Sequence, residues 1–153
     1  MNRRRFLQHG SCGLFTLSAL GLSSEATALP VSFVTGEGGA NEQRYPIPSA
    51  DGVSIDRRTQ VILVRFHNKM YAMALACPHE NAAVKWLAKD GRFQCTKHDS
   101  QYTPEGVYTT GHATRNLDRF PSRRDGDALV VALDRVFHSD QAADAWTAAS
   151  VDL

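Results

Sequence analysis

Alternation of apolar and polar residues predicts a chain built mostly from short strands. Residues 60–66 are rich in β-branched side chains, and a polar break of three residues separates them from a second apolar run at 70–76. Two such runs around a short polar break predict a β-hairpin. A smaller hairpin is expected over residues 85–94, with its turn at Gly91.

The remaining pattern is also one of short segments separated by turn residues. The other expected elements are an edge strand at 31–34 followed by a loop to residue 50, turns at 104–106 and 111–112, strands at 116–120 and 128–133 joined by a turn at 122–126, and a short Ala-rich helix within 140–150 anchored by Trp146. Short strands at close spacing predict an all-β sandwich or barrel.

Composition and charge exclude several classes of function. The chain has 153 residues, enough for one modest domain with its own core. Its formal net charge is +1, with 17 basic and 16 acidic residues, which gives no reason to expect binding to nucleic acid or an acidic membrane surface. No apolar run reaches the roughly 20 residues of a membrane-spanning helix.

The N-terminus has the pattern of an export signal. Arginines at 3–5 precede Phe6 and Leu7, an apolar stretch covers residues 11–22, and Ala28 ends an Ala-x-Ala site. The arginine pair resembles the twin-arginine export motif. We expect a signal segment at 1–28, a domain at 29–153 and a periplasmic location. An uncleaved membrane anchor and a cytosolic amphipathic helix are the alternatives.

Candidate chemistry is concentrated in two short runs, Cys77-Pro78-His79 and Cys95-Thr96-Lys97-His98. The third cysteine, Cys12, lies in the expected signal segment. Two cysteines in an oxidising compartment usually form one disulfide, but that does not explain two histidines at fixed short offsets from them. Two Cys and two His also suit tetrahedral zinc, although zinc sites more often pair like ligands within a run. A structural zinc domain and a disulfide-bonded binding module are therefore the weaker alternatives.

The pattern Cys-x-His, fifteen residues, Cys-x-x-His resembles the Rieske family. The resemblance covers about residues 61–134, with the specific motif within 77–112. It implies one [2Fe–2S] cluster per chain, with Cys77 and Cys95 on one iron and His79 and His98 on the other. It also implies an antiparallel β sandwich or barrel base carrying a small cluster-binding subdomain, with cluster loops at about 77–113.

The resemblance extends to neighbouring residues, with three departures. In high-potential members a Ser and a Tyr at the offsets of Ser100 and Tyr102 donate hydrogen bonds to cluster sulfur. Respiratory members carry a disulfide at positions that here are Ala82 and Lys97, so this chain resembles the ferredoxin-type proteins in lacking it, which argues against quinol oxidation of the cytochrome bc type. At His112 the family often has Pro.

The other histidines are expected to play smaller parts. His112 is either a surface residue or a neighbour of the cluster that affects its proton coupling. His67 and His138 are expected to be simply solvated, and His9 leaves with the signal.

The implied function is one-electron transfer at about −150 to +300 mV. The chain shows no catalytic apparatus of its own. We expect an electron-transfer subunit similar to the Rieske subunit of arsenite oxidase, or a free carrier that serves a c-type cytochrome. A membrane-anchored quinol-oxidising respiratory subunit is the alternative, and the export signal opposes a ferredoxin of aromatic-ring dioxygenases. A redox partner is expected to dock where His79 or His98 reaches the surface, near the charges of Glu80, Lys97 and Asp99.

Overall fold

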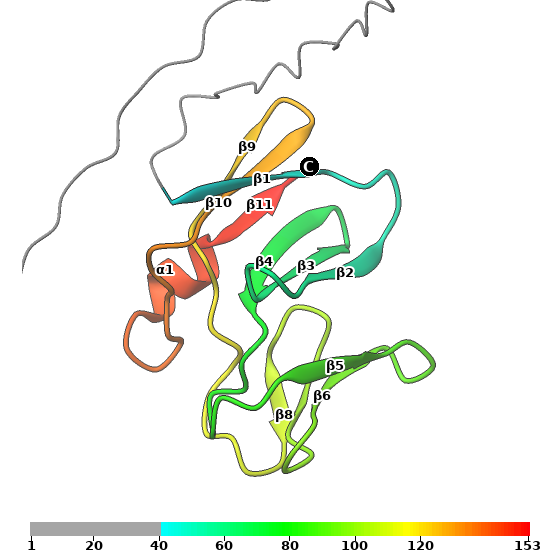
Figure 1. Cartoon of the computed structure of the whole chain (residues 1–153), viewed down its shortest axis with the longest axis vertical. Coiled ribbons are helices and arrows are strands. Elements are labelled where there is room, and N and C mark those ends of the chain that lie inside the picture. The colour runs from blue at the N-terminus through cyan, green and yellow to red at the C-terminus, as the bar shows by residue number, and fades with distance from the viewer. Residues whose placement is uncertain (1–40) are drawn as a thin grey trace, which may run out of the picture. The chain divides into compact units, whose positions relative to one another are not determined.

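The computed structural model describes residues 41–153, in which short strands predominate (Figure 1). The elements are β1 (Glu42–Pro46), β2 (Gly52–Asp56), β3 (Val61–Phe66), β4 (Lys69–Ala74), β5 (Val84–Leu87), β6 (Arg92–Cys95), β7 (Gln101–Tyr102), β8 (Tyr108–Thr110), β9 (Ser122–Asp125), β10 (Ala128–Ala132), α1 (Ala143–Ala148) and β11 (Ser150–Asp152). The expected signal segment at 1–28 and strand at 31–34 lie outside the described residues.

The strands form three antiparallel sheets, in the orders β1-β10-β9, β11-β4-β3-β2 and β5-β6-β7-β8. The first two sheets make a base, and the third makes a smaller unit at the lower end of Figure 1. This arrangement confirms the expected all-β fold with a small subdomain. In the part of the chain that the structure describes, no helix is long and apolar enough to cross a membrane.

Strand β3 is apolar on both faces because it lies between two hydrophobic cores. Val61 and Leu63 belong to the core that the two base sheets share. Ile62 and Val64 belong to a second core, which the small sheet shares. Successive residues of a strand point to opposite faces, so a strand buried on both sides needs an uninterrupted apolar run. The same geometry gives the β3–β4 hairpin its central place in the fold.

The second core joins the small sheet to the base. It includes Cys77 and Cys95 together with Phe93 and Tyr102 from the small sheet and Leu75 from the chain that follows β4. The two cysteines are therefore part of the packed interior rather than of flexible loops. Any group that they hold is fixed relative to the base.

Both predicted hairpins and the predicted helix are present. The β3–β4 turn uses His67 and Asn68 at φ 49° and 61°, and the β5–β6 turn uses Gly91 at φ 61°. In α1, Trp146 is buried and its indole nitrogen donates to the Leu117 carbonyl at 2.7 Å. Trp146 thus anchors the helix as expected.

Six strands were not expected from the pattern. Glu42–Pro46 falls in the predicted loop but pairs along its whole length with β10. Ser122–Asp125, predicted as a turn, is strand β9, and the turn follows at Gly126 with φ 63°. Strands β2, β7, β8 and β11 were not predicted at all. All six except β7 lie at sheet edges, and pairing with a neighbouring strand, not local pattern, stabilises them.

The prediction of a strand at 116–120 is wrong. Only Arg119 forms bridges there, one to Met73 and one to Phe137. On one side Phe120 donates to the Ala72 carbonyl and Ala74 donates to the Asp118 carbonyl, and on the other side Arg119 and Phe137 exchange two backbone hydrogen bonds. The segment therefore pairs with each neighbour through a single bridge and not through a continuous ladder.

Candidate metal centre

The two Cys-His runs lie in loops that close in the same way. The Cys77 backbone nitrogen donates to the Ala82 carbonyl at 2.8 Å, and the Cys95 nitrogen donates to the Ser100 carbonyl at 2.8 Å. Each cysteine therefore opens a six-residue turn that its own N–H group closes. The first loop follows β4 and the second follows β6, so two antiparallel sheets supply the site.

Left-handed residues and a bridge between the loops fix their shape. Asn81 and Asp99 occupy equivalent places and both have φ 55°, a conformation that Asn and Asp tolerate better than most residues. Thr96 in the second loop donates to the Ala83 carbonyl twice, from its nitrogen at 3.0 Å and its hydroxyl at 2.8 Å. These bonds place the loops side by side.

The cysteines form the buried end of the site. Cys77 is 0% exposed and Cys95 is 1% exposed, and neither takes part in a disulfide. Burial raises the pKa of the Cys95 thiol, but hydrogen bonds from the backbone of His98 and Lys97, together with the Cys77 side chain, outweigh burial and lower that pKa overall. The lowered pKa favours the thiolate, the form that binds metal.

The histidines form the outer end. The Nδ1 atoms of His79 and His98 lie 3.2 Å apart, and the ring centroids lie 5.0 Å apart. Two nitrogens at about 2.1 Å from one tetrahedral metal would be separated by about 3.4 Å. The two imidazoles are thus oriented to share one metal ion through Nδ1.

The thiols and the imidazoles are set apart from each other. Within residues 41–153, the one group of three or more potential ligands whose atoms all lie within 4.8 Å is His79, Glu80 and His98, and it includes no cysteine. Four donors on a single zinc ion would lie within about 4 Å of one another. The separation disfavours a mononuclear zinc site and fits a centre with two metals, one for each kind of ligand.

Buried hydroxyls surround the cysteine end. The Tyr102 phenol oxygen lies 3.1 Å from Cys77 Sγ, and Ser100 is fully buried. Burial and the neighbouring Cys77 sulfur raise the pKa of Tyr102, so the phenol keeps its proton and can donate it. The donor set and its surroundings therefore fit a two-iron cluster ligated by sulfur and nitrogen.

Comparison with known proteins also indicates a two-iron cluster. A family model described as the Rieske [2Fe-2S] domain matches residues 44–121. The chain belongs to the Rieske family. It accordingly carries a [2Fe–2S] cluster and works in electron transport.

The relatives it resembles are longer. The chain is 29% identical over 113 residues to the chloroplastic cytochrome b6-f complex iron-sulfur subunit of Volvox carteri, a match that covers 71% of this chain and 48% of that protein. It is 30% identical over 61 residues to cytochrome b6-f complex iron-sulfur subunit 1 of Nostoc sp. (strain PCC 7120 / SAG 25.82 / UTEX 2576), covering 40% and 34% of the two chains. The chain spans about half or less of the length of these relatives.

Two solved structures are similar in part. The plasma membrane Rieske protein PetC3 of Synechocystis PCC 6803 matches at 22% identity and a TM-score of 0.44, covering 52% of this chain and 82% of that one. A chain of a hyperthermophilic respiratory complex III matches at 21% identity and a TM-score of 0.44, covering 67% of this chain and 82% of that one.

His112 is both exposed and adjacent to the Rieske ligand positions. Its ring centroid lies 5.7 Å from that of His79 and 5.5 Å from that of His98. Sequence alone left these two placements as alternatives, and the structure combines them. Three imidazoles thus form the outer tip of the site.

An ion pair spans the two cluster loops. The Lys97 ammonium donates to the Glu80 carboxylate, and this hydrogen bond lowers the pKa of Glu80. Lys97 stands where the respiratory proteins have a disulfide cysteine. An exposed ion pair stabilises far less than a covalent link, so the backbone bonds of Thr96, not this pair, provide the main connection.

The environment of His138 differs from the prediction. His138 was expected to be solvated, but its Nδ1 lies 2.9 Å from the Asp118 carboxylate and Arg115 lies beside it. The side chain is only one third exposed. His67 is exposed on its turn, as expected.

Gly111 is a site residue that the sequence analysis did not identify beyond its loop. It has φ +113°, and a Cβ atom added there would lie 2.4 Å from Ser100 Cα. Gly111→Ala should therefore lower the free energy of unfolding by about 2 kcal/mol or more, from backbone strain plus the clash. Urea denaturation of the cluster-loaded protein measures this.

Gly91→Ala is the matched control, because Gly91 has φ +61° and open space around it. It should cost only the strain of about 1 kcal/mol. Equal losses in the two variants would show that close packing of Gly111 on Ser100 contributes nothing.

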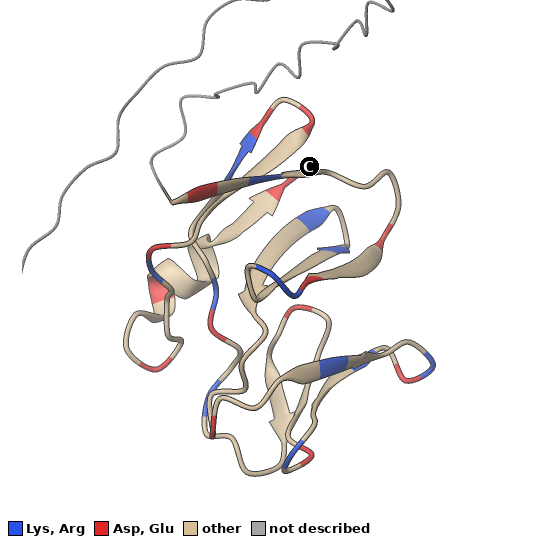
Figure 2. Cartoon of the chain, in the orientation of Figure 1, with Lys and Arg blue, Asp and Glu red and all other residues tan. Residues whose placement is uncertain are grey.

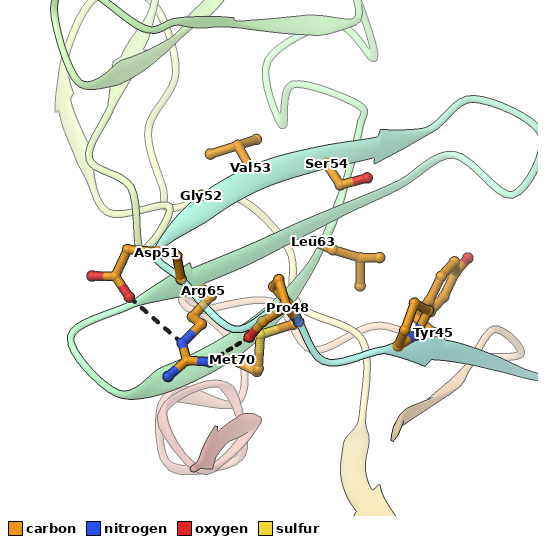
Figure 3. A pocket seen from close by; sticks show the side chains of 11 residues that line it. Tyr45, Pro48, Asp51, Gly52, Val53, Ser54, Leu63, Arg65 and Met70 are labelled. Carbon is orange, nitrogen blue, oxygen red and sulfur yellow. Dashed lines mark hydrogen bonds and ion pairs between the residues drawn. The ribbon is translucent and has the colours of Figure 1, made fainter. Parts of the chain in front are cut away.

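A pocket elsewhere on the base does not belong to the metal centre. Figure 3 shows it beside β1 and β3, with the Arg65 guanidinium at one end between Asp51 and the Pro48 carbonyl. Most of its lining is apolar, and it contains neither Cys nor His. It supplies none of the cysteine or histidine ligands of a Rieske cluster.

Proposed function

We propose that this chain passes single electrons through a [2Fe–2S] cluster held by Cys77, Cys95, His79 and His98, as a subunit of a membrane-associated complex related to cytochrome b6-f. The observation that carries the proposal is the separation of two buried thiols from two imidazoles, His79 exposed and His98 partly exposed, whose Nδ1 atoms lie 3.2 Å apart. When bound, such a cluster accepts and returns one electron at a time. Neutral imidazoles make it easier to reduce than a cluster held by four cysteines.

The assignment to a complex is supported by the relatives. Those described above are iron-sulfur subunits of cytochrome b6-f complexes, and one matches 71% of this chain. Cytochrome-type partners and quinol as the electron source follow from this similarity. Because the chain covers less than half of each relative, these partners belong to the proposal.

A second candidate is favoured by one specific observation. Ala82 and Lys97 stand where the respiratory proteins have their interloop disulfide, and here the loops are joined by the hydrogen bonds of Thr96 to Ala83 and by an exposed ion pair. The lack of this disulfide fits an electron-transfer subunit of a periplasmic oxidoreductase, similar to the Rieske subunit of arsenite oxidase, or a free carrier. In either case we propose export by the twin-arginine route, on the basis of the pattern in residues 3–28.

The exposed tip is the proposed docking face. Glu80, Lys97 and Asp99 are exposed there, next to the outer imidazoles. Figure 2 shows residues of both charge signs along the ribbon at this end of the molecule. We infer that contact with a partner depends on close fit at the imidazole edges more than on long-range attraction.

The first experiment is electron paramagnetic resonance of the purified, dithionite-reduced protein. A rhombic signal with low average g of the Rieske type supports the cluster and its proposed ligands. A silent spectrum with stoichiometric zinc and no iron would overturn the proposal. Retention in salt-washed membranes together with quinol oxidation favours the b6-f-like complex, whereas a soluble complex with another oxidoreductase favours the second candidate.

Removing either buried hydroxyl should lower the reduction potential. Tyr102 contacts Cys77 Sγ at 3.1 Å, and Ser100 is buried beside the second loop. Hydrogen bonds to sulfur stabilise the added negative charge of the reduced state, so Ser100→Ala and Tyr102→Phe should each lower the midpoint potential in a redox titration. Tyr45→Phe is the control, because the Tyr45 phenol contacts Asp56 and Thr59 in the base. Unchanged potentials in both site variants would contradict the assigned role.

A further inference from the structure

The Ser100 hydroxyl is held by two backbone N–H groups of one loop. The nitrogens of His112 and Ala113 each donate to Ser100 Oγ at 3.0 Å. A serine hydroxyl has two acceptor lone pairs and one proton. Both lone pairs are therefore engaged, and only the proton remains to be donated. It must point away from the 111–113 loop, toward the buried side, where Ser100 interacts with the Tyr102 phenol, which itself lies 3.1 Å from Cys77 Sγ.

The loop that supplies these donors is itself fixed. Gly111 packs on the Ser100 backbone so closely that no Cβ would fit, and its carbonyl accepts a 2.7 Å bond from the Tyr108 phenol. On the outer side, the His112 ring lies near the rings of His79 and His98. The loop therefore cannot turn its N–H groups away from Ser100 without losing these contacts.

We propose that the backbone N–H of His112 is a positioning group that orients the Ser100 hydroxyl toward the cluster and thereby raises its reduction potential. The proposal rests on the proposed function, because it assumes the cluster at these ligands. A hydroxyl that accepts two hydrogen bonds is polarised and becomes a stronger donor. His112 acts on Ser100 through its backbone N–H. The identity of its side chain therefore affects Ser100 only if the substituted residue lacks that N–H.

Proline is the one residue that removes this donor, and alanine is the matched control. His112→Pro loses both the N–H and the ring, whereas His112→Ala loses the ring alone. The preceding residue is glycine, which tolerates a following proline best because it has no Cβ to clash with the proline ring. The two variants therefore separate the backbone from the side chain.

The test is a redox titration of the cluster-loaded variants, followed by the EPR signal. His112→Pro should have a lower midpoint potential than His112→Ala, and the difference should vanish when both carry Ser100→Ala as well. Equal potentials for the two single variants, or a difference that persists without Ser100, would overturn the proposal. No Rieske signal in the wild-type protein would overturn the proposed function together with this inference. A wild-type signal with equal potentials overturns this inference alone.

A second measurement covers the case in which His112→Pro does not fold. Hydrogen–deuterium exchange of the wild-type protein, followed by mass spectrometry, should show protected amides in the peptide that contains His112 and Ala113. Ser100→Ala should speed their exchange, while a peptide from the β3–β4 hairpin keeps its rate. Identical exchange at 112–113 in the two proteins would refute the hydrogen bonds on which the inference depends.

Discussion

Cys77→Ala is expected to abolish cluster binding. Cys77 is fully buried in the core that joins the small sheet to the base, and no other thiol in the described residues could replace it besides Cys95, which the cluster already needs. Iron content should fall by at least about tenfold, since even residues outside the ligand set change metal affinity 10–100-fold. Because bound metal contributes to folding, the melting temperature should fall as well. Iron analysis and the visible absorption spectrum measure the first effect.

Two matched variants control this prediction. Cys12→Ala in the full-length chain should keep its iron, because Cys12 lies in the expected signal segment. Among the histidines, His79→Ala should lose the Rieske signal, whereas His67→Ala, which changes an exposed imidazole on the β3–β4 turn, should keep it. Stoichiometric iron and an unchanged signal in Cys77→Ala would contradict the ligand assignment.

Arg119→Ala should cause the largest loss of stability outside the cluster ligands. The guanidinium is buried, donates to the Trp146 carbonyl at 2.9 Å and to the Glu105 carbonyl at 2.8 Å, and lies 3.6 Å from the centre of the Trp146 ring. It thus joins α1 to the turn between β7 and β8 in the small unit. Removing it leaves two carbonyls unpaired and a cavity behind. The free energy of unfolding should fall by about 3–5 kcal/mol.

Burial of the Arg119 charge opposes part of this stabilisation. Desolvation lowers the pKa of Arg119 to about 10, which shows that the charged form is less stable inside the protein than in water. We expect the two carbonyl bonds and the stacking on Trp146 to exceed that cost. Arg119→Lys should recover only part of the loss, because an ammonium cannot reach both carbonyls in the fixed fork of a guanidinium. Urea denaturation compares these variants.

Arg124→Ala is the control for arginine removal. Arg124 is exposed on β9 and, among residues 41–153, donates only to the nearby Gly126 carbonyl, so its loss should leave the denaturation midpoint unchanged. If Arg119→Ala behaved like Arg124→Ala, the desolvation cost would cancel every contact that Arg119 makes. That outcome would refute its role as the link between the two units.

Local patterns predicted the parts of the fold that local interactions stabilise. The hairpins at 61–74 and 84–95 follow from apolar runs around polar turns, and α1 follows from an Ala-rich segment with one buried aromatic residue. The edge strands β1 and β9 were missed because they contain few apolar residues. Their stability comes from pairing with β10, which no local periodicity records.

Residue order alone was enough to predict the chemistry of this protein, from two thiols and two imidazoles at Rieske spacing with Ser100 and Tyr102 at fixed offsets. This ligand spacing can be recognised in the sequence because each loop is short and its ligands are neighbours in the chain. Tertiary structure alone decided that His112 lies against both outer imidazoles, that its N–H binds Ser100, and that Arg119 is buried between units. These arrangements depend on contacts between residues far apart in the chain. Such contacts form, and contribute to stability, only when the sheets pack against each other.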